Sequence, residues 1–258
     1  MNSITHIIAH FFLLALGFGT QLLSPVVSTK LTGVGFYKLG TSIVLACLVL
    51  GAGVDYFMLP GLSTFEMTCY ILLIVSNILG FAFHVDDKKW YMWTLYVFQI
   101  VVFTTLVFYS FQFNPQWIIF YSLSMALLSI SNFSMILGHY YLVVPKLSEE
   151  PLIYCLYIFW GIMFIKLMSS LAILFSVADP FLVPGNQLGD GYMFNWLFIS
   201  MRYLWGYAAP LTLSFFTYRL CKLRSLQSAT GVLYIVEFFV IVGELISVYL
   251  MAKHGLAL

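Results

Sequence analysis

Four ionisable residues fall deep inside long apolar stretches of the sequence: Lys166, Arg202, Glu237 and Glu244. A charge at the centre of a membrane helix costs about 2.5–3.5 kcal/mol on insertion scales, so such residues face one another or a polar path rather than lipid. The chemistry open to them is ion pairing, proton transfer or the binding of a polar head group.

Depth along the apolar stretches predicts which of these charges pair. With a rise of ~1.5 Å per residue, Arg202 and Glu237 both fall near the membrane midplane, and Lys166 and Glu244 both fall in the outer third. We therefore predict the pairs Arg202–Glu237 and Lys166–Glu244. The two glutamates are seven residues apart and share one helix face. This polar seam would serve protons, a quinone head or a solute; alternatively, the ion pairs only fix helix packing, although buried pairs stabilise weakly.

Histidines give a second set of candidates. His6 and His10 are four residues apart, so they share one helical face and could hold a metal ion. His84 and His139 end two other apolar stretches at similar depth, and two such histidines could ligate a b-type haem. Haem is the weaker cofactor hypothesis, behind a quinone, and a metal is weaker again. Interfacial or packing roles would explain all four histidines without a cofactor.

The composition indicates where these residues must lie. Of the 258 residues, 62% are hydrophobic and 8% charged, whereas roughly 25% are charged in a soluble domain. A soluble fold of this length could not cover so much apolar surface. The few scattered charges also make a nucleic-acid-binding protein improbable. The four cysteines form no CxxC pair and are predicted to be small buried hydrophobes.

The elements that position the charges are predicted to be eight transmembrane helices in an all-α, polytopic membrane domain that covers residues 1–258. A membrane helix needs about 20 largely apolar residues. The first stretch lacks the basic start of a signal peptide and is predicted to be a span. The predicted spans are 4–24, 34–53, 64–84, 91–111, 116–141, 151–176, 193–218 and 229–252.

The distribution of basic residues predicts the orientation. If the chain crosses eight times, Lys253 is the one cation at one set of helix ends, whereas eight cations lie at the opposite ends. Because positive loops stay on the cytoplasmic side, both termini are predicted to lie outside the cytoplasm, in a multi-pass protein of the cell (inner, cytoplasmic) membrane. The cations assigned to the cytoplasmic side are Lys30, Lys38, Lys88, Lys89, Lys146, Arg219, Lys222 and Arg224.

The last predicted span carries a short resemblance to a known family. The run Ile241-Val242-Gly243-Glu244-Leu245, followed by Tyr249-Leu250, resembles the ending of quinol-binding membrane anchor subunits of the dimethyl-sulfoxide and polysulfide reductase type. The resemblance covers this run and the topology. It departs from the family where an arginine usually follows the glutamate, a place taken here by Ser247 and Val248. The resemblance implies a quinone site. Resemblance to the dimethyl-sulfoxide reductase type also implies that both termini lie outside the cytoplasm and that the subunit holds no haem of its own.

Two classes of function follow. In the first, the chain is a membrane subunit of a respiratory-type redox complex, surrounded by lipid and bound to other respiratory subunits. In the second, the chain is a small-solute or proton-coupled transporter, and the polar seam binds the solute. An assembly or structural factor without a ligand is a third alternative. Motifs of nucleotide-binding and hydrolytic enzymes are absent, so the sequence assigns no catalytic residue.

Overall fold

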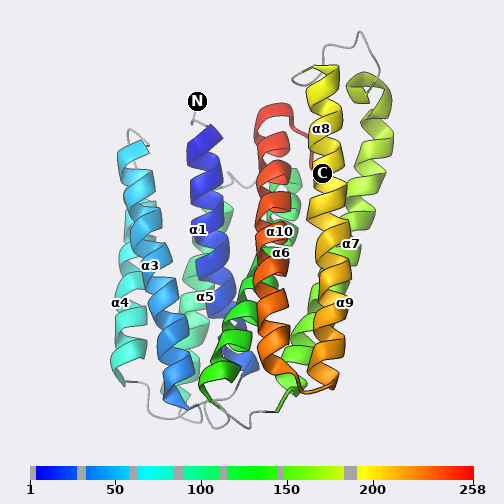
Figure 1. Cartoon of the computed structure of the whole chain (residues 1–258). Coiled ribbons are helices and arrows are strands. Elements are labelled where there is room, and N and C mark those ends of the chain that lie inside the picture. The colour runs from blue at the N-terminus through cyan, green and yellow to red at the C-terminus, as the bar shows by residue number, and fades with distance from the viewer. Residues whose placement is uncertain are drawn as a thin grey trace. The chain divides into compact units, whose positions relative to one another are not determined.

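The structure is a computed structural model that describes residues 4–27, 33–58, 63–83, 90–110, 115–144, 148–182 and 191–258. These residues are almost entirely helical and contain no strand (Figure 1). The elements in chain order are α1 (Ile4–Leu23), η1 (Ser24–Val26), α3 (Val34–Met58), α4 (Thr64–Phe83), α5 (Trp90–Ser110), α6 (Pro115–Val143), α7 (Glu150–Leu182), α8 (Tyr192–Tyr203), η2 (Leu204–Ala208), α9 (Ala209–Lys222) and α10 (Leu226–His254).

Seven helical segments in the described part of the chain are long and apolar enough to cross a membrane. The predicted span 193–218 corresponds to α8, η2 and α9, which follow one another without a gap but are individually short. Its crossing, and with it the count of eight spans and the sides of the termini, stays a prediction. Helices of this length and composition are those of a multi-pass integral membrane protein.

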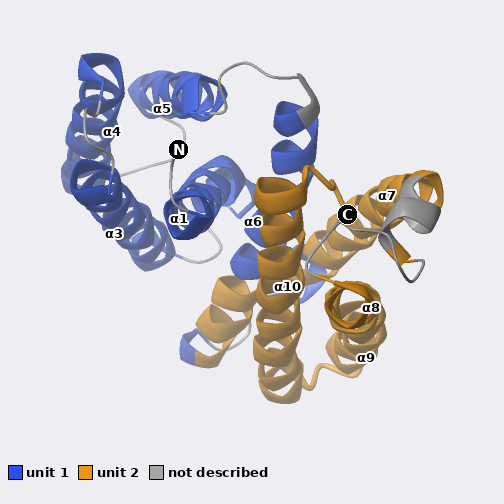
Figure 2. Ribbon diagram, turned by 90° about the horizontal axis from the view of Figure 1, so that it is seen from above, with its two compact units in different colours: residues 1–133, 143–151 blue, residues 134–142, 152–258 orange. Residues whose placement is uncertain are grey.

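The chain divides into two compact units, which Figure 2 distinguishes by colour. Unit 1 comprises residues 1–133 and 143–151, and unit 2 comprises residues 134–142 and 152–258. Helix α6 contributes its first part to unit 1 and its last turns to unit 2. Each buried cluster described below lies within one unit.

In unit 1, α1 packs on α3, α3 on α4, α4 on α5, and α5 back on α1. The first part of α6 meets α1 at Gly19, where an added Cβ would collide with the side chain of Ser129. The Ser129 hydroxyl donates to the carbonyl of Ala15 (3.2 Å), and Asn132 Nδ2 donates to Thr20 Oγ1 (3.2 Å). Small and amide side chains therefore hold α6 against α1, as is usual between membrane helices.

Helix α4 begins with a capping box. The Ser63 hydroxyl accepts a hydrogen bond from the backbone N–H of Glu66 (3.1 Å), and the Glu66 carboxylate accepts one from the backbone N–H of Ser63 (3.2 Å). This reciprocal arrangement satisfies two N–H groups that the helix start would leave open. It fixes the first turn of α4 and thereby the position of Tyr70, four residues after Glu66.

In unit 2, α10 packs along α8, η2 and α9 in succession. The contact is closest at Gly206 of η2 and Gly243 of α10, because a Cβ built on Gly243 would collide with the Gly206 backbone. Glycine at both positions lets the two backbones approach as they do at small-residue contacts in membranes. Arg202 lies at this contact, because its Nη1 would be 3.2 Å from a Cβ on Gly243, and Glu244 follows Gly243 directly in the chain.

The C-terminus of α10 folds back on its own helix. Gly255 takes a left-handed conformation (φ 70°) and donates its N–H to the carbonyl of Met251 (3.0 Å), which is a helix end that favours glycine. The last residue, Leu258, is then buried beside Ile246 and Leu250. This packing covers the face of α10 that carries Ile246, two residues after Glu244.

Candidate functional site

The carboxylate of Glu244 on α10 binds two buried cations at once. Lys166 of α7 donates from Nζ to Glu244 Oε2, and Arg202 of α8 donates from Nη1 to Oε1 at 3.2 Å. The three side chains are between 0% and 3% exposed. One carboxylate therefore bridges a lysine and an arginine in the interior of unit 2.

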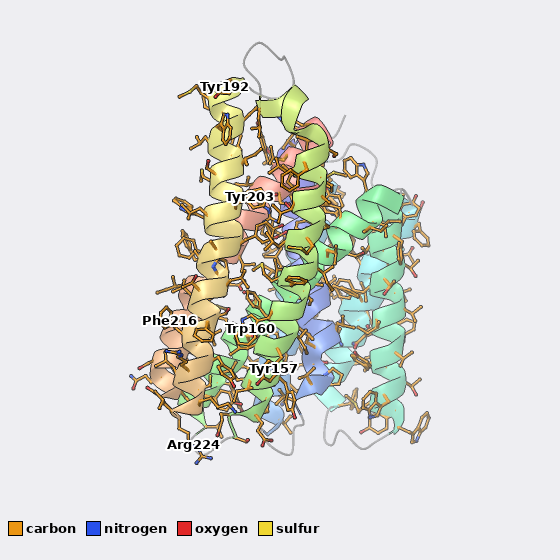
Figure 3. The ribbon with its side chains drawn as sticks, turned by 90° about the vertical axis from the view of Figure 1, so that its right-hand side faces the viewer. Tyr157, Trp160, Tyr192, Tyr203, Phe216 and Arg224 are labelled. Carbon is orange, nitrogen blue, oxygen red and sulfur yellow. The ribbon has the colours of Figure 1, made fainter. Side chains whose placement is uncertain are left out.

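Two tyrosines extend this charge cluster, which we define as Lys166, Arg202 and Glu244. Arg202 Nη2 donates to the Tyr207 hydroxyl (2.6 Å), and the guanidinium carbon lies 4.2 Å from the centre of the Tyr207 ring. The hydroxyls of Tyr203 and Ser170 are 2.9 Å apart, so Tyr203 lies on the side of α8 that faces α7 (Figure 3). The cluster is thus surrounded by hydroxyl groups and aromatic rings.

Formal charges in the cluster do not cancel. With all groups ionised, the lysine and the arginine carry two positive charges against the single negative charge of Glu244. An arginine keeps its charge under all ordinary conditions, whereas a lysine ammonium can release a proton. The arrangement can therefore exchange a proton through Lys166 or Glu244, or attract an electron-rich ligand atom.

A π-helix begins two residues after Arg202, at Leu204. Within η2, Leu204 and Trp205 are exposed, while Gly206 and Tyr207 are buried. Short π-helical turns inside α-helices occur frequently at functional sites. This turn brings Tyr207 onto the guanidinium, and the missing side chain of Gly206 leaves room for Arg202 Nη1, which lies 2.9 Å from where a Cβ would stand.

The predicted pair Lys166–Glu244 is confirmed, but Arg202 has a different partner from the predicted one. Arg202 forms its ion pair with Glu244 and not with Glu237, which is also buried on α10, so the predicted pair Arg202–Glu237 is wrong. Arg202 lies ten residues after the start of α8, and Glu244 lies ten residues before the end of α10. The prediction matched Arg202 with Glu237 because their depths were counted from opposite helix ends and over spans shorter than the real helices.

A second buried cluster lies in unit 1, around Asp55 of α3. His6 Nε2 lies 2.8 Å and His10 Nδ1 lies 2.7 Å from Asp55 Oδ1. The Tyr70 hydroxyl of α4 donates to Asp55 Oδ2 at 2.7 Å. The two imidazole centres are 5.6 Å apart, which confirms that His6 and His10 share one face of α1.

Sequence reasoning missed Asp55 and Tyr70. The predicted span ended at residue 53 and left Asp55 outside the membrane, whereas α3 continues to Met58 and Asp55 is only 1% exposed. A signal was present in the sequence, because Leu48, Gly51 and Asp55 follow one another at helical spacing on the buried face of α3.

The proposed haem pair does not gain support from the structure. His84 lies outside the described residues. His139 is exposed near the end of α6, and its Nδ1 lies 3.0 Å from the hydroxyl of Tyr234. Haem ligation by His84 and His139 stays a prediction.

Fold and composition together define the class of the protein, a multi-pass α-helical integral membrane protein. No protein-family model matches the chain, and no match was found among curated proteins or solved structures. Any more specific function must therefore follow from the chemistry of the two buried clusters.

Proposed function

We propose that this protein is a membrane subunit of a respiratory-type redox complex in the cell membrane, where the Lys166–Arg202–Glu244 cluster exchanges protons with a quinone head. The observation that carries the proposal is the single buried carboxylate shared by two buried cations. Ionisable groups inside a membrane are costly and mark sites of function by default. A cluster needed only for packing would be replaced without loss by apolar side chains.

The donors and acceptors of the cluster suit a quinone. Reduction of a quinone consumes two electrons and two protons and converts both carbonyl oxygens into hydroxyls. The electrons would come from a redox centre in a partner subunit. Lys166, Arg202 and the Tyr207 hydroxyl can donate hydrogen bonds to a carbonyl oxygen, and Glu244 can pass a proton to it.

Access from the lipid supports the same proposal. Leu204 and Trp205 are exposed on the surface of η2 at 60% and 38%, next in sequence to the buried Gly206 and Tyr207. A ligand dissolved in the bilayer would meet this surface first. Glu244 also belongs to the C-terminal run that resembles the ending of quinol-binding anchors.

Glu237 offers a second proton carrier. It precedes Glu244 by seven residues on α10, a separation of about 10.5 Å along the helix axis, and is 5% exposed. In the predicted orientation it lies on the cytoplasmic side of Glu244. Protons taken up from the cytoplasm would therefore reach Glu237 before the cluster.

Quinone binding by the purified protein tests the proposal. We expect the tryptophan fluorescence of the protein in mild detergent to be quenched on titration with a short-chain ubiquinone or menaquinone analogue. Glu244→Gln should weaken this binding at least about tenfold, equivalent to 1.4 kcal/mol. Glu66→Gln is the matched control, because glutamine keeps the capping box of α4 and Glu66 lies in unit 1.

The partners give a second measurement. A redox subunit should copurify with iron–sulfur, molybdenum or haem proteins. A protein that binds neither quinone, purifies alone and drives proton-coupled solute uptake in liposomes would contradict the proposal and identify a transporter.

A further inference from the structure

We propose that His6, His10 and Asp55 form a binding site for a divalent transition-metal ion of zinc-like chemistry. The site lies in unit 1 and does not depend on the function proposed for unit 2. His6 and His10 belong to α1 and Asp55 belongs to α3, which pack directly on each other.

The three ligand atoms already converge. One nitrogen of each histidine and one carboxylate oxygen lie within 4.8 Å of one another, and all three residues are buried. In zinc sites the nitrogen and oxygen ligands lie about 2.0–2.2 Å from the ion, which places tetrahedral ligands roughly 3.3–3.6 Å apart. The observed nitrogen–oxygen separations of 2.7 and 2.8 Å would therefore open by less than 1 Å to admit an ion.

The ligands are held by a rigid surrounding. His6 and His10 occupy successive turns of α1, the i, i+4 spacing that is common in metal-binding helices. Both histidines contact Asp55 Oδ1, whereas Tyr70 from α4 donates to Oδ2. The tyrosine thereby orients the carboxylate. A hydrogen bond of this kind to a ligand is a regular part of metal sites.

Charge also favours a cation. Asp55 contributes a negative charge, and its described contacts are the two imidazoles and the neutral Tyr70 hydroxyl. A buried carboxylate needs a compensating positive charge, which either a proton on an imidazole or a metal ion supplies. Two imidazoles and one carboxylate suit zinc, iron, cobalt or copper better than magnesium or calcium, which prefer oxygen ligands alone.

The site lies close to the helix ends. His6 is the third residue of α1, Asp55 is three residues before the end of α3, and Tyr70 is six residues after the start of α4. An ion from the adjacent aqueous phase would travel no more than about two helical turns. A water molecule can complete a four-coordinate shell from that side.

Cobalt and zinc are the probes for a test on the full chain in detergent after treatment with a chelator. Wild type should bind one Co²⁺ per chain with the visible absorption of a four-coordinate ion, and Zn²⁺ should displace it. Both Asp55→Asn and the double variant His6→Gln/His10→Gln should lose stoichiometric binding. His139→Gln is the control, since His139 lies in unit 2 and is exposed.

A further variant separates metal binding from folding. Tyr70→Phe keeps all three ligands, so it should fold and still bind Co²⁺, with an affinity lower by about 10–100-fold. If the cluster is only an ion pair between helices, wild type will show no cobalt band and the same unfolding temperature with and without Zn²⁺. That result, or unchanged binding by the double variant, would overturn the proposal.

Discussion

Glu244 and Lys166 contact each other, but their removal should have unequal effects. Glu244→Gln leaves two buried cations without a carboxylate, and breaking a buried ion pair in this way costs about 3–5 kcal/mol. Lys166→Met leaves the neutral pair Arg202–Glu244 intact and should cost clearly less. Unfolding of both variants by denaturant in detergent would measure the two effects. Equal losses, or a larger loss for Lys166→Met, would contradict the shared-carboxylate arrangement.

At the same scale, the sequence reveals the residues but not all their partners. Lys166, Arg202 and Glu244 stand out because charges in apolar stretches are rare. Asp55 does not stand out in the sequence, because a charged residue three positions from a helix end could equally well belong to a loop. Rotation about the helix axis and the true helix ends decide such cases, and composition determines neither.

At the scale of elements, the contact between η2 and α10 requires glycine. Gly243→Ala would push a methyl group against the Gly206 backbone, and such overpacking costs about 1–3 kcal/mol. Gly231→Ala is the matched control on the same helix, because open space surrounds that position. Thermal unfolding in detergent should separate the two variants by several degrees. A Gly243→Ala protein as stable as wild type would show that the helices are farther apart.

The helices themselves were predictable. Each of the eight apolar stretches coincides with a helical segment, because about 20 apolar residues in lipid must satisfy their backbone hydrogen bonds internally. The π-turn at Leu204–Ala208 was not predicted, since nothing in that composition differs from an ordinary helix. The extension of α3 to Met58 was missed because the last turn of a helix need not be apolar.

At the scale of the whole molecule, the segment α8–η2–α9 decides how many times the chain crosses the membrane. Its 31 residues from Tyr192 to Lys222 would extend about 46 Å, and Figure 1 shows them running alongside α7 and α10 within unit 2. Arg219, Lys222 and Arg224 gather at one end, as expected of a cytoplasmic side. We therefore expect eight crossings.

Reporter fusions test this topology. Alkaline phosphatase fused after Ser225 should be inactive, and after Leu258 it should be active; a fluorescent reporter should give the opposite pattern. If the segment turned back instead of crossing, both results would be reversed. A fusion after Gly33, between α1 and α3, is the control and should report the cytoplasm in either case.

The buried positions along α8, η2 and α9 have a consequence for insertions and deletions. From Asn195 to Cys221 the buried face makes seven turns in 26 residues, whereas seven regular α-helical turns take about 25. The π-turn thus takes up one extra residue, so that α8 and α9 still bury the same side of the segment. Deleting Leu204 should therefore give a straight α-helix that buries the same face and still folds, but it should weaken the proposed quinone binding because Tyr207 loses its place beside Arg202. Deleting Leu211 instead should rotate the rest of α9 by about 100° and prevent folding, which size-exclusion chromatography would show. Such a segment would tolerate the loss of one residue for folding but not for the proposed function.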